Sequence, residues 1–118
     1  MLDIQKLTDL VIKFRDKRDW KQFHNAKDVS LSLTLEANEV MEHFQWKNAD
    51  EVNSYIKTHK KEIGEELADV FYYILLMSHD LNIDISNALQ DKLKVAEKKY
   101  PVKKSKGNHI KYTELKNL

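Results

Sequence analysis

The scarcity of turn-forming residues constrains the fold of this chain more than any other feature of its sequence. The 118 residues include two glycines and one proline, and the Asn-Gly and Asp-Gly pairs typical of tight hairpins are absent. A β-sheet needs frequent tight turns, whereas long helices need few. The sequence therefore predicts an all-α protein, a compact bundle of four to five helices.

Apolar residues recur at intervals of three and four along most of the chain, which is the pattern of amphipathic helices. Asn25 and Asp28 form an imperfect capping pair that starts the second helix. Pro101 ends the last long helix, because proline disfavours helix at the residue before it. Besides that second helix, we expect helices at residues 3–18, 60–81 and 85–99, a loop at 19–24, and a short helix or loop at 48–57.

The segment from Val29 to Leu35 alternates apolar and polar residues, as a strand does, but it leads directly into the strongly helical EANEVMEHF. No turn-forming residue separates the two, so helix is predicted throughout. Glu36 and Glu39 then lie on one face, between two apolar stripes. One stripe consists of Val29, Leu33, Val40 and Phe44, and the other of Leu31, Leu35 and Trp46.

Composition limits the function classes. Lys and Arg number 20 against 19 Asp and Glu, which argues against a protein that coats nucleic acid or an anionic membrane. The absence of cysteine excludes disulfides and thiolate metal sites. The longest apolar run, Val70 to Met77, is too short to span a bilayer, and the N-terminus lacks the apolar core of a signal peptide. We expect a cytoplasmic protein with no membrane and no nucleic-acid partner.

The length suits one domain at residues 1–101, followed by a basic tail at 102–118 that is partly packed or flexible.

Two pairs of acidic residues at helical spacing are the features most suggestive of chemistry. Asp69 is the only charged residue between Leu67 and Met77, so it is predicted to point into the bundle. A buried, unpaired carboxylate costs several kcal/mol unless it is protonated, paired or bound to metal. If the second and fourth predicted segments pack face to face, four carboxylates suited to Mg²⁺ or Mn²⁺ come together: Glu36, Glu39, Glu66 and Asp69.

Two other interpretations compete with a magnesium site. A di-iron carboxylate bundle needs Glu-x-x-His pairs, but neither His43 nor His79 has a glutamate three residues before it. A solvated acidic face is the simpler alternative, since 33% of the chain is charged and helical glutamates ordinarily face water.

The order and spacing of the acids resemble a known signature. Glu36-x-x-Glu39, a spacer of 26 residues and Glu66-x-x-Asp69 are similar to the motif of the MazG-type all-α nucleotide pyrophosphohydrolases. The stretches RDWKQFH, EANEVMEHFQW, EELADVFYY, KYP and KYTEL resemble, in order, the deoxycytidine triphosphate pyrophosphatase branch of that family. The resemblance extends over nearly the whole chain.

This resemblance implies homodimers or dimers of dimers that cleave a nucleoside triphosphate, with dCTP or a related pyrimidine dNTP favoured, to the monophosphate and pyrophosphate. Such an enzyme would remove aberrant or surplus nucleotides. Glu36, Glu39, Glu66 and Asp69 would hold Mg²⁺ or, in its place, Mn²⁺. Glu36 and Glu39 would be catalytic, with Glu39 accepting a proton from water. The implied substrate-binding residues are Trp20, His24, Trp46, Tyr73 and Lys92.

Two positions need comment when the family pattern is applied to this sequence. Ala96 stands where the family commonly has an asparagine, which puts one polar contact to phosphate or sugar in doubt. Tyr72 is expected on a different helix face from Tyr73 and so unable to replace it. Two other functions stay open: a non-catalytic nucleotide sensor, and a nucleic-acid binder that uses the lysines of the tail.

Overall fold

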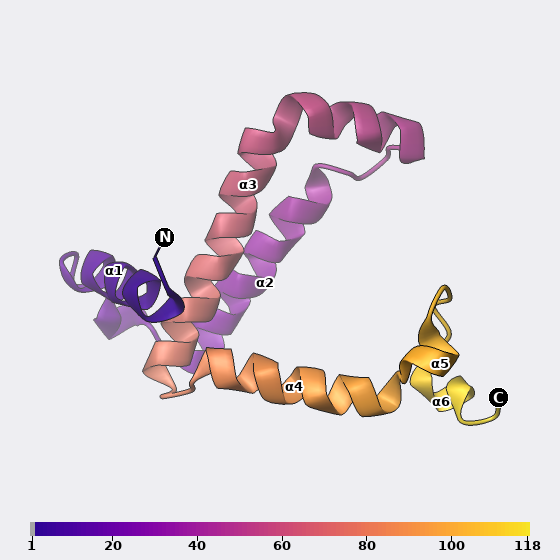
Figure 1. The fold of residues 1–118 in the computed structure, drawn as a ribbon. Coiled ribbons are helices and arrows are strands. Elements are labelled where there is room, and N and C mark those ends of the chain that lie inside the picture. Colours follow the sequence, from indigo (N-terminus) through magenta and orange to yellow (C-terminus); the bar gives the residue numbers. More distant parts are fainter. Residues whose placement is uncertain (1) are drawn as a thin grey trace. The chain divides into compact units, whose positions relative to one another are not determined.

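The structure is a computed structural model, and it describes residues 2–118. Within these residues there is no strand, and none of the helices is both long and apolar enough to cross a bilayer. The all-α prediction is confirmed, with four helices of 13 residues or more. The elements are α1 (Ile4–Asp16), the 3₁₀ turn η1 (Lys21–Phe23), α2 (Ala26–Glu42), α3 (Ala49–Asp80), α4 (Ile85–Lys99), α5 (Val102–Ser105) and α6 (Tyr112–Leu115) (Figure 1).

Local side-chain caps fix where the long helices begin. The Asn25 side chain accepts a hydrogen bond from the Asp28 N–H at 2.8 Å, as the predicted capping pair requires. Asn48 and Glu51 form a complete capping box at the start of α3. The Asp84 side chain caps α4 by accepting from the Asn87 N–H at 3.0 Å, and that helix has the bounds predicted from the sequence.

The third long helix differs from the prediction of two segments. α3 is continuous from Ala49 to Asp80, and only His59 leaves helical dihedral angles, with φ −125° and ψ 20°. Thr58 Oγ1 donates to the Tyr55 carbonyl oxygen at 3.2 Å, and His59 Nδ1 lies 3.0 Å from the same oxygen. These side chains compete with the helical backbone bond, so α3 bends rather than ends (Figure 1).

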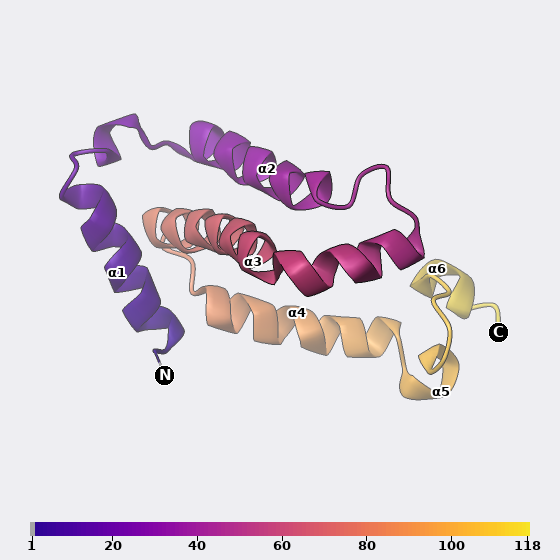
Figure 2. The same ribbon diagram turned by 90° about the horizontal axis from the view of Figure 1, so that it is seen from above.

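The chain divides into two compact units, the first ending at Ile83 and the second beginning at Asp84. In the first unit α2 and α3 run side by side as an antiparallel hairpin, and α1 packs on α3 (Figure 2). Its buried apolar side chains are Val29, Leu75 and Leu76. The core therefore lies between the N-terminal part of α2 and the C-terminal part of α3. Along the sequence, Val29 precedes Glu36, and Leu75 follows Asp69.

A buried cation links α1 to the end of α3. The Arg15 side chain is 1% exposed, and its Nη1 donates to Asp80 Oδ2 at 2.6 Å. Its Nε donates to Asp16 Oδ1 at 3.1 Å. Because a buried guanidinium is stable only when it is paired, this contact fixes how α1 joins the hairpin.

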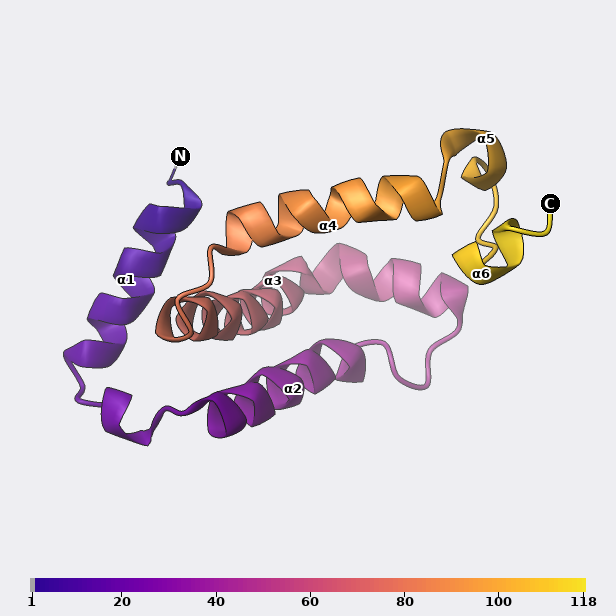
Figure 3. The same cartoon turned by 90° about the horizontal axis from the view of Figure 1, so that it is seen from below.

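The second unit consists of α4 followed by the two short helices α5 and α6 (Figure 3). The ring of Tyr112 packs edge-on against Tyr100, with the centroids 6.0 Å apart, and Lys99 Nζ lies 4.5 Å from the centre of the Tyr112 ring. Leu115 of α6 is buried. The basic tail thus packs against the end of α4, while a domain boundary at residue 101 stays a prediction.

The two apolar stripes predicted for the second helix have different environments. The first stripe is buried or half-buried from Val29 to Phe44. The second is exposed at Leu31, Leu35 and Trp46. On the neighbouring helix α3, Leu67 and Phe71 are exposed as well. A single chain therefore leaves a substantial apolar surface on the hairpin uncovered.

Candidate functional site

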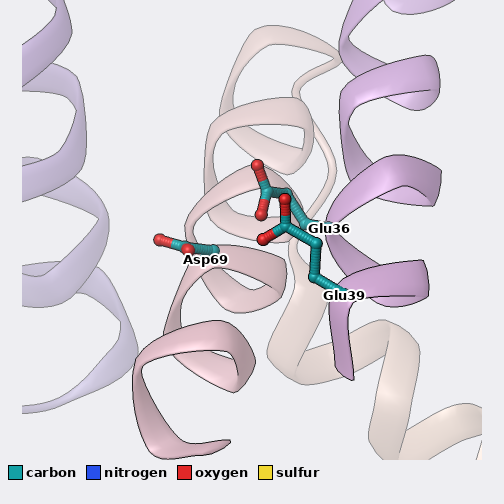
Figure 4. Close-up of side chains that lie close together, drawn as sticks. All are labelled: Glu36, Glu39 and Asp69. Atoms are coloured by element: carbon teal, nitrogen blue, oxygen red, sulfur yellow. The ribbon is translucent and has the colours of Figure 1, made fainter. Parts of the chain in front are cut away.

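Three carboxylates from two helices form the candidate metal site. Glu36 and Glu39 lie one turn apart on α2, and Asp69 comes from the adjacent helix α3 (Figure 4). One oxygen from each of the three lies within 4.8 Å of the others. The α2–α3 packing thus brings together three of the four predicted ligands.

The environment of Glu36 fits a bound cation. Its Oε2 is buried and has no hydrogen-bond partner in the part of the chain that the structure describes. Burial, and then the charges of Glu39, Asp69 and Glu66, raise the pKa of the Glu36 carboxyl. A hard cation such as Mg²⁺ or Mn²⁺ would satisfy that oxygen and neutralise the repulsion among the carboxylates.

The predicted burial of Asp69 is wrong for the single chain. Asp69 is exposed, and Glu36 is the least exposed carboxylate of the three. The sequence pattern failed here because the apolar neighbours Leu67 and Phe71, which suggested a buried helix, are themselves exposed. An apolar sequence context indicates burial only where another segment covers it.

Glu66, the fourth predicted ligand, lies outside this three-carboxylate group. Its Oε2 contacts His43 Nε2, and His43 Nδ1 is 2.5 Å from Tyr55 Oη. His43 is not among the predicted site residues, because it is not preceded by a glutamate at the spacing of a Glu-x-x-His pair. A usable signal was present, since His43 follows Glu39 by four residues and therefore shares its helix face.

A cleft of about 460 Å³ opens beside the carboxylates. Three of the four aromatic and histidine side chains predicted to line the nucleotide pocket line it: Trp20, His24 and Tyr73. Glu36 and Asp69 line the same cleft. The volume is in the range of pockets that hold small molecules. The remaining lining residues are Leu10, Val11, Phe14 and Tyr72.

An aromatic cluster forms one wall of this cleft. Phe14 packs edge-on against Trp20 and against Tyr72, with centroid separations of 5.8 and 6.2 Å. Tyr72 and Tyr73 both line the cleft, although they lie on different faces of α3. The reason is that α1 also contributes to the cleft, so the cleft reaches two neighbouring faces of α3. Burial raises the pKa of the Tyr72 hydroxyl.

Trp46, which was also predicted to bind substrate, does not line this cleft. Trp46 is 91% exposed and has a left-handed backbone conformation with φ 69°, which is rare for a bulky side chain. Lys92 is an exposed residue of α4, in the second unit. Their roles stay predictions.

Glu36→Gln is expected to stabilise the metal-free protein at pH 7.5. Because the pKa of Glu36 is raised, the folded state binds its proton more tightly than the unfolded state does. Ionisation of Glu36 therefore destabilises the folded state. This destabilisation is complete at pH values above the raised pKa and absent at pH values below the ordinary glutamate pKa. The melting temperature of the variant in EDTA should exceed that of the wild type, by a margin that shrinks as pH falls to 5.

Circular dichroism melts at both pH values measure this difference. Glu62→Gln is the matched control, since Glu62 is an exposed glutamate outside the three-carboxylate group. Equal melting temperatures for Glu36→Gln and wild type at pH 7.5 would show that the Glu36 carboxylate is not destabilising.

Comparison with known proteins gives consistent matches. The model of the MazG-like family matches residues 31–115. The mouse and human proteins named dCTP pyrophosphatase 1 are 32% and 30% identical over 114 residues, which cover 95% of this chain and 67% of each relative. A pyrophosphatase from Archaeoglobus fulgidus, known from its crystal structure, has 33% sequence identity to this chain. The two structures superpose with a TM-score of 0.80, and the match covers 86% of this chain and 94% of the other. The chain therefore belongs to the MazG-like family.

Proposed function

We propose that this protein is a Mg²⁺-dependent nucleoside triphosphate pyrophosphohydrolase. It would cleave a dNTP, with dCTP or a related pyrimidine dNTP preferred, into the monophosphate and pyrophosphate. The observation that carries the proposal is the cleft that Glu36 and Asp69 line together with the aromatic residues Trp20 and Tyr73. The names of the mouse and human relatives support the choice of base.

Glu36, Glu39 and Asp69 would hold the metal, with Glu66 as the fourth ligand. When bound, Mg²⁺ neutralises phosphate charge and acidifies a coordinated water. Glu39 is more exposed than Glu36 and would accept the proton of the water that attacks the α-phosphorus. Mn²⁺ is the alternative ion, since it favours the same oxygen ligands.

The cleft offers the groups needed to hold a nucleoside. Trp20 provides a flat face for base stacking, which contributes roughly 1–3 kcal/mol per base. His24 Nδ1 is buried and has no hydrogen-bond partner among the described residues, so it is available to a polar atom of base or sugar. Lys92 would contact phosphate, as a point charge. Ala96 would leave one polar contact of the family pattern unmade.

A second copy of the chain would complete the site. Exposed apolar side chains on α2 and α3, including Leu31, Leu35, Leu67 and Phe71, form a surface suited to homodimerisation, and a dimer of dimers would use further apolar surface. Trp46 is outside the cleft of its own chain, so we propose that it enters the cleft of the partner and stacks on the base. The enzyme would then act in the cytoplasm by removing unwanted nucleotides.

Pyrophosphate release from a panel of dNTPs, NTPs and 5-substituted dCTPs, measured with Mg²⁺ and with EDTA, tests this proposal. We expect metal-dependent pyrophosphate, not orthophosphate, with the pyrimidine deoxynucleotides fastest. Binding of dCTP without turnover of any nucleotide would instead favour the non-catalytic sensor.

Trp46→Ala is expected to raise the KM for dCTP about tenfold or more, with little change in the melting temperature, because the side chain is 91% exposed. Steady-state kinetics and a melting curve measure the two effects. Phe23→Ala is the control, since Phe23 is an exposed aromatic residue that does not line the cleft.

Mixing two variants tests whether Trp46 acts in the partner. At low dCTP, an equimolar mixture of Trp46→Ala and Asp69→Asn should recover about a quarter of wild-type activity, because half of randomly paired dimers are hybrids with one complete site. An unchanged KM for Trp46→Ala would remove Trp46 from the site, and absence of recovery would place it in the cleft of its own chain.

A further inference from the structure

Glu66 is distinguished from the other three acids by its partner. Glu36, Glu39 and Asp69 approach one another, whereas Glu66 Oε2 contacts the imidazole of His43. His43 is the C-cap residue of α2, directly after Glu42, and Glu66 belongs to α3. The His43 side chain is 13% exposed and that of Glu66 is 26% exposed, so the contact is largely shielded from water.

The contact assigns the proton of the imidazole. An ionised carboxylate only accepts hydrogen bonds, so His43 Nε2 carries a hydrogen and donates to Glu66. His43 Nδ1 lies 2.5 Å from Tyr55 Oη, and in the neutral imidazole with its proton on Nε2 it accepts the hydrogen bond of that hydroxyl. A histidine fixed on one nitrogen by a hydroxyl and donating from the other to a carboxylate resembles the outer shell that orients metal ligands in proteins.

The Tyr55 side chain is itself held in place. Its ring stacks on His59 at 3.8 Å with the planes 3° apart, directly at the bend of α3. Lys47 Nζ lies 4.3 Å from the centre of the Tyr55 ring and donates to the His43 carbonyl oxygen at 2.8 Å. Lys47 of the α2–α3 loop and His59 at the bend therefore hold Tyr55, and through it the His43 imidazole, in place. Neither Lys47 nor His59 lines the cleft.

We propose that His43 is a positioning residue for the metal site. Its Nε2–H holds Glu66 Oε2 and would thereby fix the orientation in which Glu66 serves as the fourth ligand beside Glu36, Glu39 and Asp69. The inference rests on the proposed function for the identity of the ion, but it concerns metal affinity and not the nucleotide. His43 touches neither substrate nor reacting atoms, and its effect passes through Glu66.

Titration calorimetry with Mn²⁺ alone tests the proposal without substrate. His43→Leu should raise the Kd for Mn²⁺ by about 10- to 100-fold, the usual effect of removing an outer-shell partner. His43→Gln should recover most of the affinity, because the glutamine amide can donate to Glu66. In turnover assays, His43→Leu should need more metal for half-maximal rate yet reach a kcat within about twofold of wild type at saturating metal.

Two comparisons separate positioning from a general structural role. His79→Leu is the matched control, since His79 is an exposed histidine of α3 that is not part of the three-carboxylate group, and its Kd should equal that of wild type. Tyr55→Phe keeps the ring stack but removes the hydroxyl, and it should raise the Kd less than His43→Leu does.

A Kd for His43→Leu that equals or falls below the wild-type value would overturn the proposal, as would failure of His43→Gln to recover affinity while its melting temperature is normal. If wild type binds Mn²⁺ but hydrolyses no triphosphate, the proposed function fails and the His43 test still stands. If wild type binds no Mn²⁺, both fail.

Discussion

Replacing Asp69 with asparagine is expected to lower metal-dependent pyrophosphate release by at least about 100-fold while leaving the helical fold intact. Loss of a residue that only hydrogen-bonds to a metal ligand typically lowers metal affinity or activity 10- to 100-fold. Loss of a direct ligand should therefore lower the activity by at least about 100-fold. Asp69 is the one member of the three-carboxylate group that α3 contributes. Because Asp69 is exposed, an isosteric asparagine removes charge without disturbing packing.

Pyrophosphate release at saturating Mg²⁺ and a thermal melt followed by circular dichroism measure the two parts of this result. Glu65→Gln serves as the control, because Glu65 is an exposed acid on the same helix, one turn before Asp69, and lies outside the group. Normal turnover in Asp69→Asn would remove Asp69 from the site, and a lost circular dichroism signal would mean that the residue supports the fold.

The second large effect is expected on stability. Asp80→Asn should destabilise the protein by about 3 kcal/mol, because it leaves the buried Arg15 guanidinium with Asp16 as its one carboxylate partner. The Asp16 side chain is 51% exposed and therefore compensates little. For a chain of this size the melting temperature should fall by roughly 10 °C.

The order of the variants makes this prediction specific. Arg15→Met should cost less than Asp80→Asn, since the remaining Asp80 side chain is 26% exposed and water can reach it. The double variant should be more stable than Asp80→Asn alone, because no unpaired buried charge remains. Chemical denaturation gives the free energies of unfolding. Additive losses in the double variant would show that the two side chains do not interact.

The helices were predictable because their signals are local. Asn25 and Asp84 begin helices wherever the rest of the chain lies, since each cap bonds to a backbone N–H three residues away. Pro101 follows the end of α4 for an equally local reason. The bend at His59 was misread as a break because its cause is a competition for one carbonyl oxygen, which residue type alone does not reveal.

The candidate site was predictable in part. Spacing places Glu36 beside Glu39, because residues three apart on a helix share a face. It does not determine which carboxylate is buried, and the structure assigns that position to Glu36 instead of Asp69. Nor does it indicate that Tyr72 joins Tyr73 in the cleft, since the position of α1 decides which faces of α3 are lined.

By itself, then, the sequence determined the helical class, the starts of α2 and α4, and the placement of Glu36 and Glu39 on one helix face, because each depends on contacts within a few residues. The tertiary structure alone decided that Glu66 meets His43 and that Arg15 is buried against Asp80. Both contacts join residues far apart in the chain, and their distances depend on how the helices pack. Helix packing is set by the whole shape of the meeting side chains, which no periodic pattern encodes.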